Sequence, residues 1–450
     1  MGSFIQSITS FFEIPGFNWK LLILGFTAAN FVFDSYLSLR QIKHLKATHD
    51  KVPVELQEKI DAKTALKSQD YSLSKLKFSM FSGIYSLIQD VLVMKYDILP
   101  IVWSKSFEIM IKFNEKLPLF NFMSGSITQS LIFFGQFGLL RLLLSLPISY
   151  YQNFVLEEKF GFNKLTFKLW ITDMLKEIAV SVILGFPFLA IFLKIIDYFG
   201  DNFMFYASSF LFIFQIFIVI VYPKFIQPLF NKLTPLENGD LKSSIEKLAA
   251  DNKFPLDKLY VIDGSKRSSH SNAYFLGLPW GPKQIVIYDT LIEHSSVPET
   301  TAVLGHEIGH WALSHTTKML LISQVHTFAI LTLFAGFVKN NSLYQSFGFY
   351  KDQPILIGFI LFGDILSPLD AFITFLMNLL SRKYEYQADE YSVNLGYAKE
   401  LSNALIILHK ENLSSMSVDW LYSAYQYNHP HLTERLRAIN KLVANEKKQE

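Results

Sequence analysis

The sequence contains no cysteine among its 450 residues. A disulfide framework, a thiolate metal site and a cysteine nucleophile are therefore excluded together. The sequence also lacks an excess of charge of either sign, because the formal net charge is only +2. This near-balance argues against a broad basic surface for nucleic acid. We expect any metal ion to be held by histidine and carboxylate side chains, and we expect no nucleic-acid partner.

Polar residues are scarce: 50% of the chain is hydrophobic, 16% is aromatic and only 18% is charged. This composition favours a polytopic membrane protein over a soluble one. Apolar runs of about 20 residues predict seven spanning helices. They lie at residues 18–38, 78–102, 119–147, 169–194, 203–222, 319–338 and 354–380. The second run is the weakest, because it carries Asp90 and Lys95.

Charged residues interrupt other spans at Asp34, Arg141, Asp364 and Asp370. A charge at bilayer depth is costly unless it faces a bundle interior or a water-filled cavity, so these positions indicate a wet interior. The alternative is that several lie near helix ends and extend to the membrane surface.

Residues 1–17 contain no lysine or arginine, so the first apolar run lacks the basic flank of a signal peptide and is expected to be retained. Basic residues instead follow this run, at Arg40, Lys43, Lys46, Lys51, Lys59, Lys63, Lys67, Lys75 and Lys77. The positive-inside rule places residues 39–77 in the cytosol and the N-terminus in the lumen. Seven spans then return the C-terminus to the cytosol.

Four regions follow from this topology. Residues 1–222 carry five spans and their loops, 223–318 form a cytosolic insertion, 319–380 carry two spans, and 381–450 form a cytosolic C-terminal region. In the insertion, "GDLKSSIEKLAADN" predicts an amphipathic helix. "KLYVID" and "KQIVIYD" predict two strands that form a hairpin around the turn-rich "SHSNAYFLGLPWGPK".

The stretch "VLGHEIGHWALSH" is expected on a helix that begins near Pro298 and runs toward the sixth span. His306 and His310 are four residues apart, so both imidazoles leave one helix face and can bind one zinc ion. Zinc lowers the pKa of a bound water to about 7, and Glu307 is placed to accept its proton. The pattern H-E-x-x-H therefore predicts a metal-dependent hydrolase. The alternative is a buried helix whose histidines bond to neighbours.

A catalytic zinc commonly takes three protein ligands, so another residue must come from elsewhere. The segment "SRKYEYQADEYSVNLG" offers Glu385 and Asp389, four residues apart on an expected helix. Glu385 would complete the site, and Asp389 would accept a hydrogen bond from a liganding imidazole and fix its tautomer. Composition alone favours a solvated acidic face, and only the need for a third ligand reverses that preference.

The segment "YNHPHLTERL" supplies His429 and Arg435. Either side chain would stabilise the oxyanion of a tetrahedral intermediate if it lay near the metal. An equally good interpretation is the start of a surface helix with Pro430 near its first position.

These motifs together carry a family resemblance. "VLGHEIGHW", "EYQADEY", "SKRSSHSNAYFLGLP", "FNKLTPLENG" and "FVLEEKFGFNKLTFKLWITDM" resemble the type I CAAX prenyl proteases, integral membrane zinc metalloproteases of the endoplasmic reticulum. The resemblance covers nearly the whole chain and is more specific than the zinc motif alone.

The resemblance implies roles for individual residues. One zinc ion per chain would be held by His306, His310 and Glu385, with Glu307 as general base. Asp389 would lie behind the metal site, His429 and Arg435 near the catalytic centre, and Asn272 and Ala273 in an edge segment that aligns the substrate backbone.

The fold implied is an all-α polytopic membrane protein with seven transmembrane helices enclosing a water-filled chamber. A small α+β zinc metalloprotease domain would lie on the cytosolic side. The activity implied is removal of the C-terminal aaX tripeptide from prenylated CaaX proteins at a lipid membrane, with a second, N-terminal cut in an a-factor-type pheromone precursor in fungi. The endoplasmic reticulum membrane is the expected location, and the inner nuclear membrane is a second candidate.

Two other functions remain open at this point. A quality-control metalloprotease would share the chemistry and would cleave unprenylated or translocation-stalled chains. A transporter or channel would explain the spans and their charges but would leave the zinc motif without a role. The final "KKQE", with Lys447 and Lys448, matches a dilysine retrieval signal or an ordinary charged tail.

Overall fold

The computed structural model describes residues 2–49, 51–116 and 124–449. In the first half of the chain the helices are α1 (Gly2–Phe12), α2 (Trp19–Ala47), α3 (Ala62–Lys95), α4 (Ile98–Lys116), α5 (Ser126–Tyr151), α6 (Glu158–Phe160), α7 (Phe167–Val180), α8 (Phe186–Phe199), α9 (Phe203–Val221) and α10 (Gln227–Phe230). The second half adds α11 (Asp240–Asp251), α12 (Asp289–His294), α13 (Val297–Ala312), α14 (His315–Phe337), α15 (Asn341–Ser346), α16 (Ile355–Ser392), α17 (Ala398–Glu411), α18 (Trp420–Gln426) and α19 (Leu432–Gln449).

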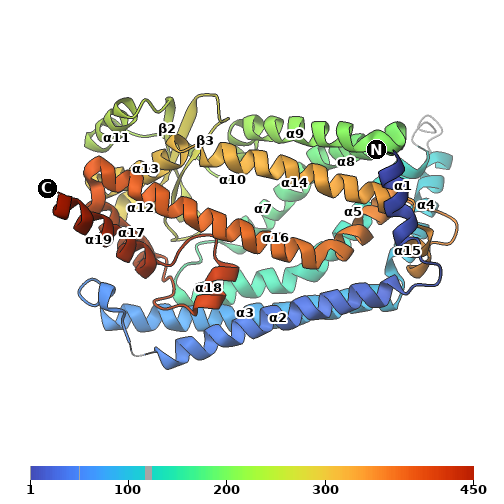
Figure 1. The fold of residues 1–450 in the computed structure, drawn as a ribbon, viewed down its shortest axis with the longest axis horizontal. Coiled ribbons are helices and arrows are strands. Elements are labelled where there is room, and N and C mark those ends of the chain that lie inside the picture. Colours follow the sequence, from blue (N-terminus) through green and yellow to red (C-terminus); the bar gives the residue numbers. More distant parts are fainter. Residues whose placement is uncertain (1, 50, 117–123, 450) are drawn as a thin grey trace.

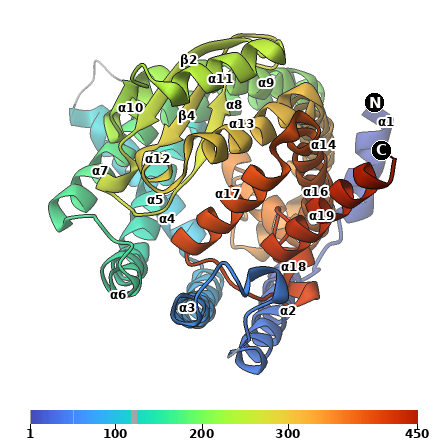
Figure 2. The same cartoon turned by 90° about the vertical axis from the view of Figure 1, so that its left-hand side faces the viewer.

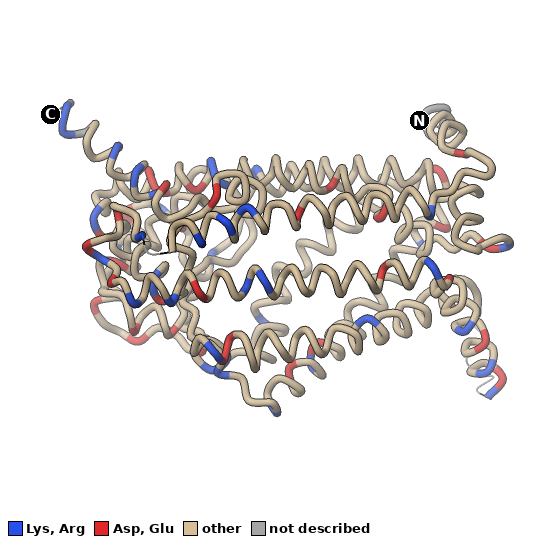
Figure 3. Tube along the Cα trace, turned by 90° about the horizontal axis from the view of Figure 1, so that it is seen from below, with Lys and Arg blue, Asp and Glu red and all other residues tan. Residues whose placement is uncertain are grey.

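The molecule is elongated, and its long helices run along the long axis (Figure 1). The strands, α11, α13, α17 and α19 gather at one end, whereas α1, α4 and α15 lie at the other. The two termini lie at opposite ends of this axis. Charged residues are dense at both ends and sparse between them (Figure 3). This distribution is what a bilayer around the middle section requires.

Five helical stretches of the described chain are long and apolar enough to cross a membrane. They are Trp19–Ala47, Ser126–Phe160, Phe167–Phe230, His315–Phe337 and Ile355–Glu411. The third contains two of the expected spans, because α8 and α9 within it pack against each other. Residues 119–123 of the expected span 119–147 lie outside the described residues. The chain is a multi-pass membrane protein, and the count of seven spans stays a prediction.

The expected span at residues 78–102 is wrong as a single helix. α3 ends at Lys95, α4 begins at Ile98, and between them Asp97 adopts a positive φ of 51° that breaks the helix. α3, with 34 residues, is long enough to cross a bilayer, but it is not among the five apolar stretches.

Several charges inside the expected spans have polar partners. Arg141 pairs with Asp90 at 2.9 Å, and Asp34 accepts a hydrogen bond from Gln426 at 3.4 Å. Such pairing lowers the cost of polar groups at membrane depth. A single enclosed water-filled chamber stays a prediction.

The sheet lies at the end of the molecule that carries α13. Its strands are β1 (Leu233–Pro235), β2 (Leu256–Ile262), β3 (Ala273–Leu276) and β4 (Lys283–Tyr288), in the order β1-β2-β4-β3. The predicted hairpin between "KLYVID" and "KQIVIYD" is wrong, because β2 and β4 pair in parallel. The segment between them contains a strand of its own, β3, which pairs antiparallel with β4. Parallel neighbours need a long crossover, and residues 263–282 supply it.

The predicted amphipathic helix is confirmed as α11, and it packs against α13. One apolar core joins these helices to the sheet: Ile285 and Ile287 of β4 meet Leu304 and Ile308 of α13, all fully buried. Viewed from this end, α13 lies close to α16 and α17 (Figure 2). The core therefore fixes α13 between the sheet and the C-terminal helices.

Candidate metal centre

The helix that carries the H-E-x-x-H motif has a well-defined start and end. Ser296 and Glu299 form a capping box that satisfies the free backbone groups of its first turn. The helix does not continue into the sixth span as one unit. It ends at Ala312, Ser314 adopts a left-handed conformation with φ 58°, and α14 begins at His315. The motif therefore lies one sharp turn from an apolar spanning helix.

Gly309, inside the motif, allows α13 and α16 to approach closely. A Cβ atom added there would lie 3.2 Å from the backbone of Ala388 and 3.0 Å from the Cβ of Tyr391. Only glycine leaves room for this contact without a shift of one helix. The approach brings the histidines of α13 beside the acidic residues of α16.

His306, His310 and Glu385 place their ligand atoms together. The two Nε2 atoms lie 3.2 Å apart, Glu385 Oε1 lies 3.2 Å from His310 Nε2, and Glu385 Oε2 lies 3.4 Å from His306 Nε2. Tetrahedral zinc with bonds of about 2.0–2.1 Å separates its ligand atoms by about 3.3 Å. The spacing of these three side chains therefore fits one metal ion of this kind.

The environment of Glu385 also favours a metal ion. Its side chain is 5% exposed, and its Oε2 is buried with no hydrogen-bond partner in the described chain. A buried carboxylate oxygen without a hydrogen bond is costly unless a cation compensates it. The donor set, two imidazoles and one carboxylate, matches the three-ligand sites of catalytic zinc.

Asp389 and Arg435 hold His306 from behind. The Nδ1–H of His306 donates to Asp389 Oδ1 at 2.9 Å, which leaves its Nε2 facing the site. Arg435 donates to both oxygens of Asp389 in a two-bond clamp. Burial lowers the pKa of His306, but its bonds to Asp389 and Glu385 outweigh this and raise it to about 9. Metal binding must therefore release a proton.

A histidine that the sequence analysis missed performs the same task for His310. His315 Nε2 donates to Gln387 Oε1 at 3.1 Å, so in its neutral form His315 Nδ1 accepts from His310 Nδ1 at 3.0 Å. His310 Nε2 is then free for a metal. The ring of His315 also stacks on Tyr384. The general need of a liganding histidine for a second partner could have directed attention to "HWALSH".

Glu307 lies on the open side of the centre. It lines a cavity of about 160 Å³ together with His306, Glu385, His429 and Ala273. Burial raises the pKa of Glu307. A carboxylate whose pKa is raised above its usual range is a better proton acceptor than an ordinary one.

His429 and Arg435 both reach the centre. His429 Nε2 lies 3.3 Å from Glu385 Oε1, and its side chain is 57% exposed. Arg435 Nη1 lies 3.7 Å from Glu385 Oε2, and its side chain is 11% exposed. α19 begins at Leu432, two residues after Pro430. The first turn of α19 faces the centre and is not a free surface.

The edge segment also meets the centre. Ala273 begins β3, the terminal strand of the sheet, and both Asn272 and Ala273 line the 160 Å³ cavity. Arg267, in the loop before β3, makes a two-bond ion pair with Asp173 of α7. This pair ties the start of the edge strand to a helix of the apolar stretch. The outer edge of β3 pairs with no other strand of the described chain.

Fold and site together place the chain among the integral membrane metallopeptidases. Profiles of two families match it: "CAAX prenyl protease N-terminal, five membrane helices" over residues 41–232 and "Peptidase family M48" over residues 235–443. The chain belongs to the CAAX prenyl protease family of M48 peptidases.

Named relatives and a solved structure match nearly the whole length of the chain. CAAX prenyl protease 1 of Saccharomyces cerevisiae is 49% identical, with 96% of this chain and 98% of the relative covered. CAAX prenyl protease 1 homolog of Homo sapiens is 38% identical, with 93% and 94% covered. The crystal structure of S. mikatae Ste24p superposes with a TM-score of 0.88 at 50% identity, covering 95% of this chain and all of that one.

Proposed function

We propose that this protein is a zinc metalloendopeptidase that removes the C-terminal aaX tripeptide from prenylated CaaX proteins. The observation that carries the proposal is the tetrahedrally spaced His306, His310 and Glu385 at the end of the spanning helices. The names of the relatives supply the substrate class. Nitrogen and oxygen ligands in this number favour zinc.

The residues of this chain would share the work as follows. The outer edge of β3 aligns the substrate backbone by strand addition, with Asn272 and Ala273 nearest the scissile bond. Glu307 accepts the proton of the attacking water and later passes it to the leaving amine. His429, on the open side, donates to the oxyanion, while Arg435 and Asp389 hold His306 in place. A zinc ion held by His306, His310 and Glu385 would acidify a bound water and polarise the scissile carbonyl.

The membrane explains how such a substrate reaches the centre. A buried lipid chain contributes about 0.8 kcal/mol per CH₂ group, so a prenylated C-terminus concentrates at the bilayer. α14 begins three residues after α13 ends, so the metal motif is adjacent to membrane-crossing structure. A lipid-tethered terminus would therefore meet the centre without leaving the membrane.

We also propose the endoplasmic reticulum membrane as the location, with the N-terminus luminal and the metal centre cytosolic. The basic loop at residues 39–77 supports this orientation. Termini at opposite ends of the long axis fit an odd number of spans (Figure 1).

The direct test is tripeptide release by the purified protein from a farnesylated CaaX peptide and from its unprenylated twin. We expect release only with the metal present and a clear preference for the farnesylated peptide. Equal cleavage of both peptides would favour the quality-control protease. No cleavage of either peptide by the zinc-loaded protein would refute both protease functions. A pheromone precursor, offered separately, tests for the second, N-terminal cut.

A further inference from the structure

A second cavity adjoins the metal centre. It has a volume of about 660 Å³, well within the range of ligand sites, and it lies between α3, the end of α17 and the segment 422–432. His429 lines both this cavity and the small one around the metal. The larger cavity therefore begins where the scissile bond would lie.

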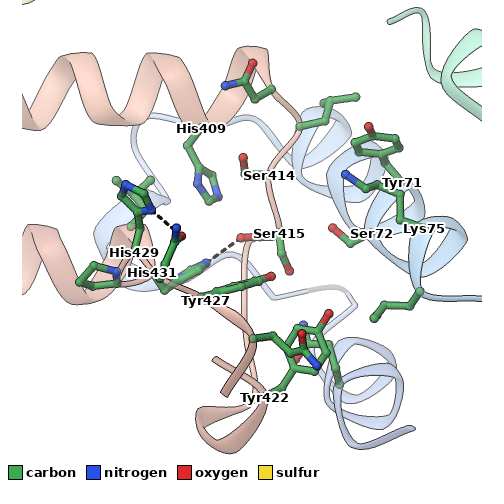
Figure 4. A pocket seen from close by; sticks show the side chains of 18 of the residues that line it. Tyr71, Ser72, Lys75, His409, Ser414, Ser415, Tyr422, Tyr427, His429 and His431 are labelled. Carbon is green, nitrogen blue, oxygen red and sulfur yellow. Dashed lines mark hydrogen bonds between the residues drawn. The ribbon is translucent and has the colours of Figure 1, made fainter. Parts of the chain in front are cut away.

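The cavity has a one-sided charge. Its lining contains one ammonium group, Lys75, and four histidines, and none of the lining residues is acidic. Lys75 projects from α3 on the side opposite His429 (Figure 4). No carboxylate of the described chain lies within ion-pair distance of Lys75, whose Nζ instead lies 4.9 Å from the ring of Tyr71. An unpaired cation in an acid-free cavity favours an anionic ligand.

The direction of the edge strand shows which end of a substrate points there. β3 runs from Ala273 to Leu276, and its first residue is at the metal. A peptide added antiparallel runs the other way, so its C-terminal part passes Ala273 toward His270. His270 lines the large cavity, and the proximity of Lys75 contributes, after burial, to lowering its pKa to about 4. The C-terminal part of the substrate, which leaves after cleavage, would thus enter the cavity that contains Lys75.

We propose that Lys75 binds the free C-terminal carboxylate of the substrate, and that this contact fixes the cut three residues from the end. Leu401, Leu405 and Leu408 of α17 line the small cavity and would take the first aliphatic residue after the scissile bond. His409, the next residue of α17, and Asn412, directly after the helix, line the large cavity. The three substrate residues after the scissile bond, if extended, span about 10 Å.

This inference rests on the proposed function and goes beyond it by naming how the chain end is recognised. A charge-assisted contact to a carboxylate changes binding by roughly tenfold to a hundredfold. A C-terminal amide has the same shape but no charge. Comparing the two termini therefore isolates the contact from the rest of the peptide.

The experiment measures kcat/KM of the full-length, zinc-loaded protein on a farnesylated CaaX peptide with a free or an amidated C-terminus. The wild type should prefer the free carboxylate by at least about tenfold. Lys75→Ala should lose this preference by slowing only the free-acid peptide, and Lys75→Arg should restore part of it. Lys77→Ala, two residues along the same helix and outside the cavity, should retain the wild-type preference.

The outcomes separate the two proposals. Equal rates of the wild type on acid and amide, or a full preference in Lys75→Ala, would overturn the role of Lys75 while leaving the peptidase intact. Cleavage of neither peptide by the wild type would refute the proposed function, and the inference with it. Zinc content and thermal unfolding of each variant show whether the protein is folded.

Discussion

At the scale of residues, Asp389 connects the metal centre to the rest of the fold. Its side chain is 1% exposed, accepts from His306 and is clamped by Arg435. A buried ion pair of this kind costs about 3–5 kcal/mol when one partner is removed. Its contribution to function is to fix the orientation and tautomer of one metal ligand.

Replacing Asp389 should therefore weaken metal binding. We expect Asp389→Asn to lower zinc affinity by about 10–100-fold, because the neutral amide removes the negative charge that His306 and Arg435 share and replaces one of the two acceptor oxygens with a donor. Competition against a chelator of known affinity measures the change. Glu390→Gln, the exposed neighbour on α16, is the matched control and should bind zinc like the wild type. Equal zinc affinity in the wild type and both variants would show that Asp389 does not support metal binding.

A second residue-scale prediction concerns pH. His270 stacks on Phe162 and bonds to Ser268, and burial lowers its pKa to about 4. The unfolded chain, with an ordinary histidine pKa of about 6.5, binds the proton more tightly, so this contribution to stability is full above that pH and is lost toward pH 4. We expect the unfolding temperature to fall less steeply over this range in His270→Gln than in the wild type. An equal fall of the unfolding temperature with pH in both proteins would contradict a lowered pKa for His270.

Sequence spacing was enough to nominate His306, His310 and Glu307, because i and i+4 positions share a helix face. Glu385 and Asp389 needed the additional assumption that two helices meet. The clamp by Arg435 and the support from His315 depend on tertiary contacts over 46 and 72 residues, which local pattern does not encode.

At the scale of elements, the contact between α13 and α16 assembles the ligand set. Gly309 permits it, because any Cβ there meets the backbone of Ala388. At Gly305, one turn earlier, an added Cβ would meet the Oγ of Ser392 at 3.1 Å, a side-chain atom with some freedom to move. The two glycines of one helix therefore differ in what they tolerate.

This difference is testable. We expect Gly309→Val to separate the helices, reduce bound zinc well below one per chain and abolish activity, with a loss of stability of about 1–3 kcal/mol from overpacking. Gly305→Ala should keep its zinc. Metal analysis and thermal unfolding of both variants are the measurements. Full zinc occupancy in Gly309→Val would show that the helix contact does not assemble the site.

The prediction of elements from sequence failed in two places. One is a strand pairing that depends on a distant segment, and the other is a helix break that depends on one residue. The alternation in "KLYVID" and "KQIVIYD" indicated strands correctly, but their parallel pairing depends on β3 lying outside β4. One residue, Asp97, ends the run that hydropathy joined into a span. A hydropathy average over about 20 residues does not detect a helix break at a single residue.

At the scale of the whole molecule, the two ends differ. The catalytic elements and the C-terminus occupy one end, and the N-terminus occupies the other (Figure 1). Composition and apolar runs were sufficient to predict a multi-pass protein, because length and hydrophobicity determine membrane insertion. They were not sufficient to predict the number of spans, because α3 is long enough to cross a bilayer but is not among the apolar stretches.

The absence of cysteine makes orientation measurable. Single cysteines at exposed Ser10 and Lys447, introduced as Ser10→Cys and Lys447→Cys, can be labelled in sealed microsomes with a membrane-impermeant maleimide. We expect Lys447→Cys to react at once and Ser10→Cys only after detergent. Immediate labelling of both would place the termini on one side and contradict an odd number of spans.

The central claim is that Glu307 moves the proton at a metal held by His306, His310 and Glu385. Tripeptide release by Glu307→Gln, measured on protein whose zinc content is determined in the same sample, tests it most directly. The account predicts about one zinc per chain and a fall in kcat of at least about 100-fold, since the metal ligands remain and the base is gone. A zinc-loaded Glu307→Gln protein that releases the tripeptide at the wild-type rate would contradict it.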